Sequence, residues 1–316
     1  MFNFKLDKIN FQEELGSGVS GCIYPYQKSP EDKKWVVKYT RATNINELLK
    51  VLPEIVLGFA CNHPSILPIN GYHIEKSHPT GFDIYFKLPR MVKSLKDYIK
   101  QKRREQNHFS EEIIVKYFYT MVCGIEYMHR RKIAHRDIKP SNILVDSNDK
   151  IQISDVGIAK FVADDETSCI LTEREGTYQY SAPEILNRNQ SLKKRDLYKA
   201  DVWSLGMTLS ELCLLELKWI NFVSSTPNAD PESEIQSIIE KIEKLYSQPL
   251  AKLVYQMLSL DPAKRLSIEE VRVKLEQDYK NILVKFRNEI LSYNKIGFSR
   301  IQDIEATREL SRIHQY

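Results

Sequence analysis

The sequence predicts an α+β fold in which an antiparallel sheet carrying one helix is followed by a mainly helical part. Up to about Tyr85 the apolar residues form short runs typical of strands, with one helical pattern from Ile45 to Cys61. Beyond Ser94 the apolar residues recur every three or four positions, as on the buried face of a helix. These two regimes predict a sheet-bearing first part and a helical second part.

The composition indicates a globular protein and excludes several classes. Of the 316 residues 42% are hydrophobic and 10% aromatic, which is typical of a folded core. A net charge of +4, from 46 basic and 42 acidic residues, is too balanced to predict a nucleic-acid partner. Five dispersed cysteines without a C-x-x-C spacing favour a reducing compartment, and no stretch is apolar enough to span a membrane. We therefore expect a soluble, cytoplasmic protein.

The first part contains four runs that we expect to be strands, namely residues 11–15, 22–24, 34–39 and 83–86. The helical pattern between the last two contains Pro53, which lacks an N–H and is expected to kink or restart the helix.

The second part begins with a long helix. Ser110 is a good N-cap, and a stripe of apolar residues continues from Ile114 to Met128. A hairpin is expected at 143–145 and 151–153. Further helices are expected at 199–217, 232–246, 250–258 and 267–275.

A glycine-rich segment lies between the first two expected strands. It has the form G-x-G-x-x-G and consists of Gly16, Ser17, Gly18, Val19, Ser20 and Gly21. Glycines allow backbone amides to approach phosphate oxygens, although an isolated match is equally compatible with a simple turn. A strand follows it, which disfavours a dinucleotide-binding turn of the strand-to-helix kind.

Three further features carry polar groups beside apolar runs. Lys38 lies within an apolar strand and is either an edge residue or a buried cation that needs an anionic partner. The segment from His135 to Asn142 combines the acid Asp137, a base and an amide in a short loop. Asp155 follows an apolar run, where it either closes an Asx turn or offers a carboxylate to a cation.

Taken in order, these motifs resemble those of eukaryotic-type serine/threonine protein kinases, over residues 9 to 278. The matching segments are the glycine-rich loop, Val36-Val37-Lys38, His135-Arg136-Asp137-Ile138-Lys139-Pro140-Ser141-Asn142, Asp155-Val156-Gly157, Ala182-Pro183-Glu184, Asp201-Val202-Trp203 and Asp261-Pro262-Ala263-Lys264-Arg265. The resemblance implies the bilobal protein kinase fold, with an N-lobe at 1–90, a C-lobe at 91–278 and a helical extension at 279–316.

The resemblance also implies site residues. Asp137 would deprotonate the substrate hydroxyl and Lys139 would neutralise the γ-phosphate of ATP. Lys38 would orient the α- and β-phosphates and pair with Glu54, with Glu47 as the second candidate. ATP would further contact Leu15, Gly16, Ser17, Gly18, Val19, Ser20, Gly21, Ile23, Val36, Met91 and Leu144.

Metal binding and architecture are implied in the same way. Asn142 and Asp155 would hold Mg²⁺. Glu184 and Arg265 would form a buried ion pair, and Asp201 would support the catalytic loop from below. By this resemblance, Lys139 and the later segment Gly176-Thr177 favour serine and threonine over tyrosine as the phosphorylated residue. The implied partner is therefore a protein substrate.

Two residues depart from the family pattern. Val156 replaces a usual Phe, and Gly58 stands where a bulky residue normally joins the two lobes. Two small residues would leave a void or require filling from elsewhere, so we hypothesise a loosely coupled active state that needs phosphorylation or a partner. Unchanged basal activity of Val156→Phe would count against this hypothesis.

The resemblance assigns Arg136 to gathering a phosphate on the activation segment. Candidate phosphosites are Thr167, Ser168 and Thr172, and Glu173 lies where it could supply part of that charge. A polar surface loop without modification is the other interpretation of this segment.

Other functions stay open at this stage. A pseudokinase that keeps the fold for binding is one, although Lys38, Asp137, Asn142 and Asp155 are all present. A small-molecule kinase is disfavoured by the intact Ala182-Pro183-Glu184 segment. We expect the extension to pack on its own domain, with autoregulation as the alternative.

Overall fold

The computed structural model describes residues 5–18, 21–27, 34–77, 81–156, 159–162, 168–169, 176–186, 195–218 and 230–286, and the statements below concern these residues.

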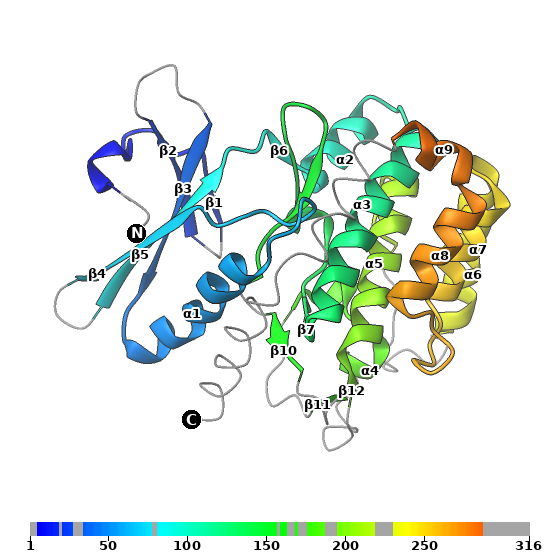
Figure 1. Cartoon of the computed structure of the whole chain (residues 1–316). Helices are drawn as coiled ribbons and strands as arrows, with labels where there is room; N and C mark the ends of the chain where they lie inside the picture. The colour runs from blue at the N-terminus through cyan, green and yellow to red at the C-terminus, as the bar shows by residue number, and fades with distance from the viewer. Residues whose placement is uncertain are drawn as a thin grey trace.

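A five-stranded antiparallel sheet forms the first part, preceded by the short helix η1 (Leu6–Lys8), and Figure 1 shows it apart from the helical part. The strand order is β1-β2-β3-β5-β4. The bounds are β1 (Gly16–Gly18), β2 (Gly21–Tyr26), β3 (Trp35–Ala42), β4 (Gly71–Ser77) and β5 (Gly81–Pro89). The strands predicted at 22–24, 34–39 and 83–86 are confirmed as parts of longer strands.

The strand predicted at 11–15 is wrong, and β4 had not been predicted. The side chain of Asn10 accepts the Gln12 N–H at 3.2 Å, which turns the chain, and Phe11 is 51% exposed. A local side-chain bond thus prevails over the β propensity of this segment. In β4 the alternation is weak because only Tyr72 and Ile74 of its seven residues are apolar.

The single helix of this part, α1 (Ile45–Ala60), begins at Asn44, whose side chain accepts the Glu47 N–H. Leu48 and Ile55 are buried in a cluster with the sheet residues Ile84 and Phe86. Pro53 lies inside one continuous helix, so of the two expected effects, a kink or a restart, the restart is wrong. Packing against the sheet sustains the helix through a residue that removes one backbone hydrogen bond.

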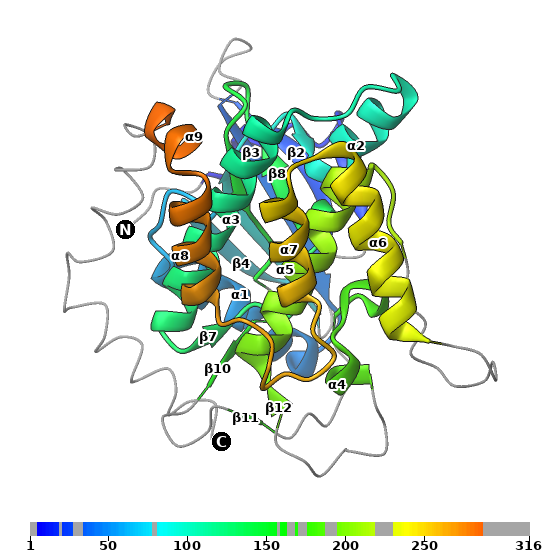
Figure 2. The same ribbon diagram turned by 90° about the vertical axis from the view of Figure 1, so that its right-hand side faces the viewer.

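The second part is mainly helical, as predicted. Its helices are α2 (Leu95–Arg104), α3 (Glu111–Arg130), α4 (Pro183–Leu186), α5 (Leu197–Leu214), α6 (Pro231–Leu245), α7 (Gln248–Met257), α8 (Ile268–Asp278) and α9 (Lys280–Lys285). The apolar helices α3 and α5 pack on each other and are surrounded by the rest (Figure 2). The α+β architecture is thereby established.

Short elements connect the two parts and build the loops of the site. A three-stranded sheet has the order β6-β8-β9, and its β8 and β9 are the predicted hairpin. Their bounds are β6 (Lys93–Ser94), β7 (Ile133–Ala134), η2 (Pro140–Asn142), β8 (Ile143–Val145), β9 (Ile151–Ile153), β10 (Lys160–Phe161), β11 (Ser168–Cys169), η3 (Tyr178–Tyr180) and β12 (Arg195–Asp196).

The described part of the C-terminal extension packs on the helical part, as expected. Leu283 of α9 is buried, and Lys285 pairs with Glu112 of α3 at 3.1 Å. The rest of the extension, 287–316, lies outside the described residues. A membrane-spanning helix, long and apolar enough to cross a bilayer, is not found in the described part of the chain.

Candidate active site

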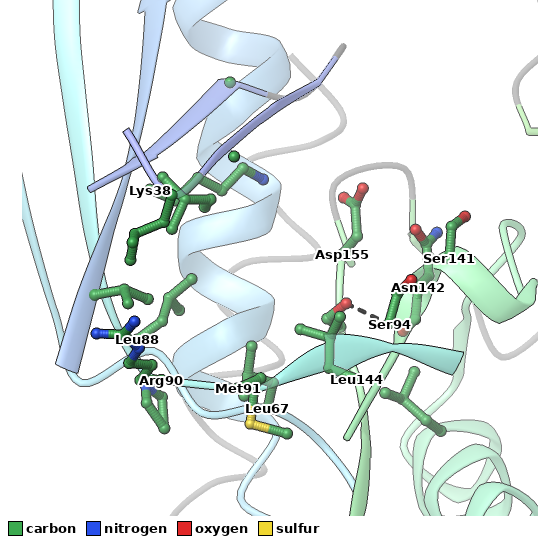
Figure 3. Close-up of a pocket in the computed structure, with 18 of the residues that line it drawn as sticks. Lys38, Leu67, Leu88, Arg90, Met91, Ser94, Ser141, Asn142, Leu144 and Asp155 are labelled. Atoms are coloured by element: carbon green, nitrogen blue, oxygen red, sulfur yellow. Dashed lines mark hydrogen bonds between the residues drawn. The ribbon is translucent and has the colours of Figure 1, made fainter. Parts of the chain in front are cut away.

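A cavity of about 570 Å³ separates the sheet from the helical part. Figure 3 shows Lys38 on one side of it and Asp155, Asn142 and Ser141 on the other. The predicted nucleotide contacts that line it are Leu15, Gly16, Ser17, Gly21, Ile23, Val36, Lys38, Met91 and Leu144. Gly18 ends β1, and Val19 and Ser20 lie outside the described residues.

The segment that joins the two parts leaves one backbone donor for a ligand. Pro89 has no N–H, the Arg90 N–H donates to the Lys34 carbonyl at 2.8 Å, and the Val92 N–H donates to the Val145 carbonyl at 2.8 Å. Among the described residues the Met91 N–H has no backbone acceptor. Because Met91 lines the cavity, this N–H can bind the edge of a planar base.

Lys38 of β3 is a buried cation with an anionic partner. Its Nζ lies 2.6 Å from Oε1 of Glu54, on α1, and 5.6 Å from the ring centroid of Phe86. Burial raises the pKa of Glu54, although Lys38 lowers it in part. Glu47, the second candidate, accepts the Thr43 N–H at 2.7 Å on the exposed first turn of α1, so the structure pairs Lys38 with Glu54.

Asp137, in the helical part across from Lys38, is the centre of a hydrogen-bond network. Its carboxylate accepts from Lys139 Nζ at 2.6 Å, from Asn142 Nδ2 at 2.9 Å and from the N–H and Oγ1 of Thr177 at 3.0 and 2.8 Å. Burial alone would raise the pKa of Asp137, but these bonds outweigh it and hold the pKa below its ordinary value. The carboxylate is therefore ionised and oriented at neutral pH.

Asp201 of α5 holds the backbone of this loop. It is buried, and it accepts the His135 N–H and the Arg136 N–H, each at 2.8 Å, and lies 2.9 Å from Nε2 of His129. Arg136 has φ 71°, a left-handed conformation that costs free energy in a residue other than glycine. The two bonds that Asp201 accepts offset that cost and fix the loop that carries Asp137, whose carboxylate is bonded to the cavity residue Asn142.

Oxygen atoms that could act as ligands of a small divalent cation line the cavity. The amide nitrogen of Asn142 donates to Asp137, so its oxygen is the atom that it can offer to a cation. The Asn142 carbonyl accepts the Ser154 N–H at 2.8 Å, which places Asp155 next to it. Carboxylate and amide oxygens completed by substrate phosphates are typical ligands of Mg²⁺.

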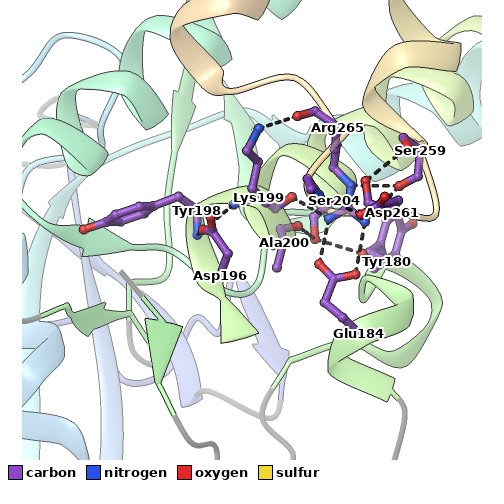
Figure 4. A network of polar contacts seen from close by, with 11 residues as sticks. Tyr180, Glu184, Asp196, Tyr198, Lys199, Ala200, Ser204, Ser259, Asp261 and Arg265 are labelled. Atoms are coloured by element: carbon purple, nitrogen blue, oxygen red, sulfur yellow. Dashed lines mark hydrogen bonds and ion pairs between the residues drawn. The ribbon is translucent and has the colours of Figure 1, made fainter. Parts of the chain in front are cut away.

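Behind the loop, Glu184 and Arg265 form the ion pair expected between the two motifs. Arg265 Nη1 and Nη2 lie 2.7 and 3.0 Å from the two Glu184 oxygens, and Arg265 also donates to the carbonyls of Ser259 and Lys199 (Figure 4). The pair ties the segment after Thr177 to α5 and to the loop before α8.

The gap expected at Gly58 is filled by a side chain of another element. A Cβ on Gly58 would lie 2.2 Å from Cδ1 of Ile69, so Ile69 occupies that space. Val156 is buried in the core of the helical part. The filling comes from the segment between α1 and β4, which sequence motifs do not identify.

Some residues at the site were missed by sequence reasoning. The sequence relates Thr177 only to the preference for serine and threonine and does not predict its bonds to Asp137. Ser94 and Asp97 at the start of α2 also line the cavity. A serine three residues before an aspartate at a helix start is a visible N-cap pattern. Of the other predicted residues, Gly157, Thr167, Thr172 and Glu173 lie outside the described residues, as does the side chain of Ser168.

Comparison with characterised proteins finds several kinases of moderate identity. CBL-interacting protein kinase 26 of Oryza sativa subsp. japonica is 28% identical over 274 residues, which cover 84% of this chain and 51% of that protein. Probable serine/threonine-protein kinase nek1 of Dictyostelium discoideum is 26% identical over 318 residues, 94% of this chain and 61% of that protein. SNF1-like protein kinase ssp2 of Schizosaccharomyces pombe is 28% identical over 270 residues, 83% of this chain and 42% of that protein.

The chain thus spans 42% to 61% of the length of these relatives. A sequence profile described as the protein kinase domain matches residues 9–275, which is most of the chain. The fold agrees, because a sheet with one helix faces a helical part across the cavity that holds the matching motifs. The resemblance seen in the sequence is confirmed, and the chain belongs to the protein kinase domain family.

Proposed function

We propose that the chain is a serine/threonine protein kinase that transfers the γ-phosphate of ATP to protein hydroxyl groups. The observation that carries the proposal is the network in which Lys139, Asn142 and Thr177 orient the ionised Asp137 beside the cavity. Relatives named as serine/threonine kinases support it. Phosphoryl transfer needs little covalent help from the protein, so positioning and charge carry the catalysis.

Each residue has a distinct task in this proposal. Lys38, held by Glu54, orients the α- and β-phosphates of ATP, and the Met91 N–H binds the base. Asp137 accepts the proton of the attacking hydroxyl, and Lys139 neutralises charge on the γ-phosphate. Asn142 and Asp155 would hold Mg²⁺, which supplies neutralisation of the β- and γ-phosphate charge when bound.

The substitution Asp137→Asn tests this function. Purified protein is incubated with Mg·ATP and a serine- and threonine-containing peptide library, and phosphate incorporation is measured. We expect a loss of about 100-fold or more for Asp137→Asn, the usual contribution of a general base. The matched control Asp7→Asn, outside the cavity, should behave as the wild type.

Two results would contradict the proposal. Equal incorporation by Asp137→Asn and wild type would show that Asp137 is not the base. ATP binding by the wild type without any incorporation would instead support the pseudokinase alternative, in which the fold serves binding only. ATP affinity is measured separately, because Asp137→Asn should retain it.

Regulation through the activation segment is part of the proposal. It rests on Arg136, whose N–H is held by Asp201, and on the candidate phosphosites Thr167, Ser168 and Thr172. Ser168 lies in β11, which pairs with β12 ahead of α5. If mass spectrometry finds no phosphate at these positions in fully active protein, regulation by phosphorylation of this segment is contradicted.

We also propose a reducing, cytoplasmic setting. Cys22, Cys61, Cys123 and Cys213 are all free thiols, and three of them are buried. Burial raises the pKa of Cys61 to about 12, which keeps that thiol protonated and unreactive. Fractionation that recovers the protein from an oxidising compartment would contradict this placement.

A further inference from the structure

A further buried carboxylate, Glu211, is not among the residues that the proposed function uses. Glu211 of α5 has a side chain that is only 2% exposed. Its Oε2 accepts the hydroxyl of Tyr180 at 2.5 Å, and its Oε1 lies 2.6 Å from Nζ of Lys96. The carboxylate therefore joins η3 to α2, two elements that are far apart in the sequence.

Such a carboxylate is costly to bury without a cation. Removing an ion from water is unfavourable unless a charge and hydrogen bonds replace the solvent. Lys96 supplies the charge and Tyr180 supplies the hydrogen bond. A hydrogen bond to an ionised acceptor is also stronger than one to a neutral acceptor, so Lys96 strengthens the hold of Glu211 on Tyr180.

Lys96 lies near the nucleotide cavity, and Tyr180 lies near Asp137. Lys96 lies in the first turn of α2, next to Ser94 and Asp97, which line the nucleotide cavity. Tyr180 lies three residues after Thr177, which donates two hydrogen bonds to Asp137. The charge of Asp137 itself contributes to raising the pKa of Tyr180, after burial and Glu211, so the two groups lie within electrostatic reach of each other.

We propose that Lys96 is a positioning residue for the protein substrate. Through Glu211 it holds Tyr180, and with it the segment 177–181, beside the carboxylate that receives the substrate hydroxyl. This inference rests on the proposed kinase function, because the hydroxyl must approach Asp137 next to that segment. Lys96 touches neither nucleotide nor hydroxyl and acts only through Glu211.

Lys100, another cation of α2, makes an exposed ion pair. Lys100, one turn further along the helix, has a side chain that is 62% exposed and lies 3.7 Å from the equally exposed Asp97. An exposed pair of this kind contributes little. Lys96 differs because its side chain is 34% exposed while its partner is buried. Lys100 is therefore a matched control on the same helix.

The test compares Lys96→Met, Lys96→Arg and Lys100→Met in steady-state kinetics with a peptide selected from the library. We expect Lys96→Met to raise KM for the peptide about tenfold, the size of one lost hydrogen bond to a charged group, with KM for ATP unchanged. Lys96→Arg, which keeps the charge, should restore most of the loss, and Lys100→Met should match the wild type.

A second measurement does not depend on activity. Hydrogen exchange of the amides of 177–181 should be faster in Lys96→Met than in the wild type and normal in Lys100→Met. In a Glu211→Gln background the substitution Lys96→Met should add no further change, because the two residues act as one unit. Should Lys96→Met not fold, Tyr180→Phe removes the hydroxyl end of the same connection and should raise the same KM.

Specific outcomes overturn the inference. It fails if Lys96→Met and Lys100→Met behave alike, if KM for ATP rises as much as KM for the peptide, or if Lys96→Met and Glu211→Gln have additive effects. An inactive wild type would refute the proposed kinase function instead, and the exchange measurement would then still decide whether Lys96 positions the segment.

Discussion

At the scale of single residues, the site depends on how buried charges are compensated. Asp137 receives four hydrogen bonds, and its pKa lies below the ordinary value of about 3.9. It is thus already ionised well below neutral pH, and its loss of charge does not limit activity near neutrality. For Glu54 the effect of burial is the larger one, so its pKa is raised even though Lys38 lowers it in part.

We expect Lys38→Met to destabilise the protein by roughly 3 kcal/mol at neutral pH, because it leaves a buried carboxylate without its cation. The pKa of Glu54 should then rise further. A folded state with the higher pKa binds the proton more tightly, so the free energy of unfolding of this variant should increase as pH falls through that pKa.

Urea unfolding between neutral and acidic pH measures this effect. The double variant Lys38→Met/Glu54→Gln lacks the titrating group and should show no extra pH dependence relative to the wild type. A destabilisation of Lys38→Met that stays constant with pH would show that Glu54 does not carry it.

At the scale of elements, α1 combines two unusual residues. Pro53 removes one backbone hydrogen bond, yet the helix is continuous, because its inner face is packed on the sheet. Gly58 allows Ile69 to lie against the helix, where a larger residue would collide with it. The void anticipated from Gly58 is thus filled from elsewhere, and the hypothesis of a loosely coupled active state now depends on Val156 alone.

We expect Gly58→Leu and Ile69→Ala to be destabilising singly and to compensate each other when combined. The leucine would overpack against Ile69, at a cost of about 1–3 kcal/mol. Ile69→Ala would leave a cavity and cost about 2–4 kcal/mol. The double variant should be more stable than either single variant, because the leucine refills the space.

Denaturant unfolding of the four proteins in a double-mutant cycle checks this prediction. Strict additivity would mean that the introduced leucine and the side chain of Ile69 do not compete for one space. Adding Val156→Phe to each of the four proteins and measuring their activity tests the hypothesis of a loosely coupled active state.

At the scale of the whole molecule, the cavity couples the sheet to the helical part. Its walls come from β1, β2 and β3 on one side and from η2 and β8 on the other. A ligand held by both walls binds only the folded state and stabilises it by mass action. Behind the site, Arg265 binds both Glu184 and the Lys199 carbonyl of α5, which ties these parts of the helical region together (Figure 4).

We expect Mg·ATP at 100 times its Kd to stabilise the protein by about 2.7 kcal/mol, seen as a rise in Tm. Removing Mg²⁺ with a chelator should reduce the rise, because Asn142 and Asp155 would then face the phosphates without a cation. In Asp155→Asn, a rise in Tm that still depends on Mg²⁺ to the wild-type extent would contradict the assigned ligand.

Local order along the chain was predictable from the sequence. Helix positions follow from the period of apolar residues, and capping by Ser110 follows from a local hydrogen bond. The identities of Lys38, Asp137 and Asp155 as polar groups beside apolar runs were likewise visible. Where a local bond competed with propensity, as between Asn10 and Gln12, the strand prediction was wrong.

Most elements and the order of the motifs can be read from the sequence, because both depend on neighbouring residues. Three contacts become visible only in the folded chain: Ile69 fills the space at Gly58, Thr177 binds Asp137 and Lys96 reaches Glu211. Lys96 and Glu211 are 115 positions apart, and no local rule relates them. Such contacts depend on how whole helices and loops pack, which is a property of the assembled core.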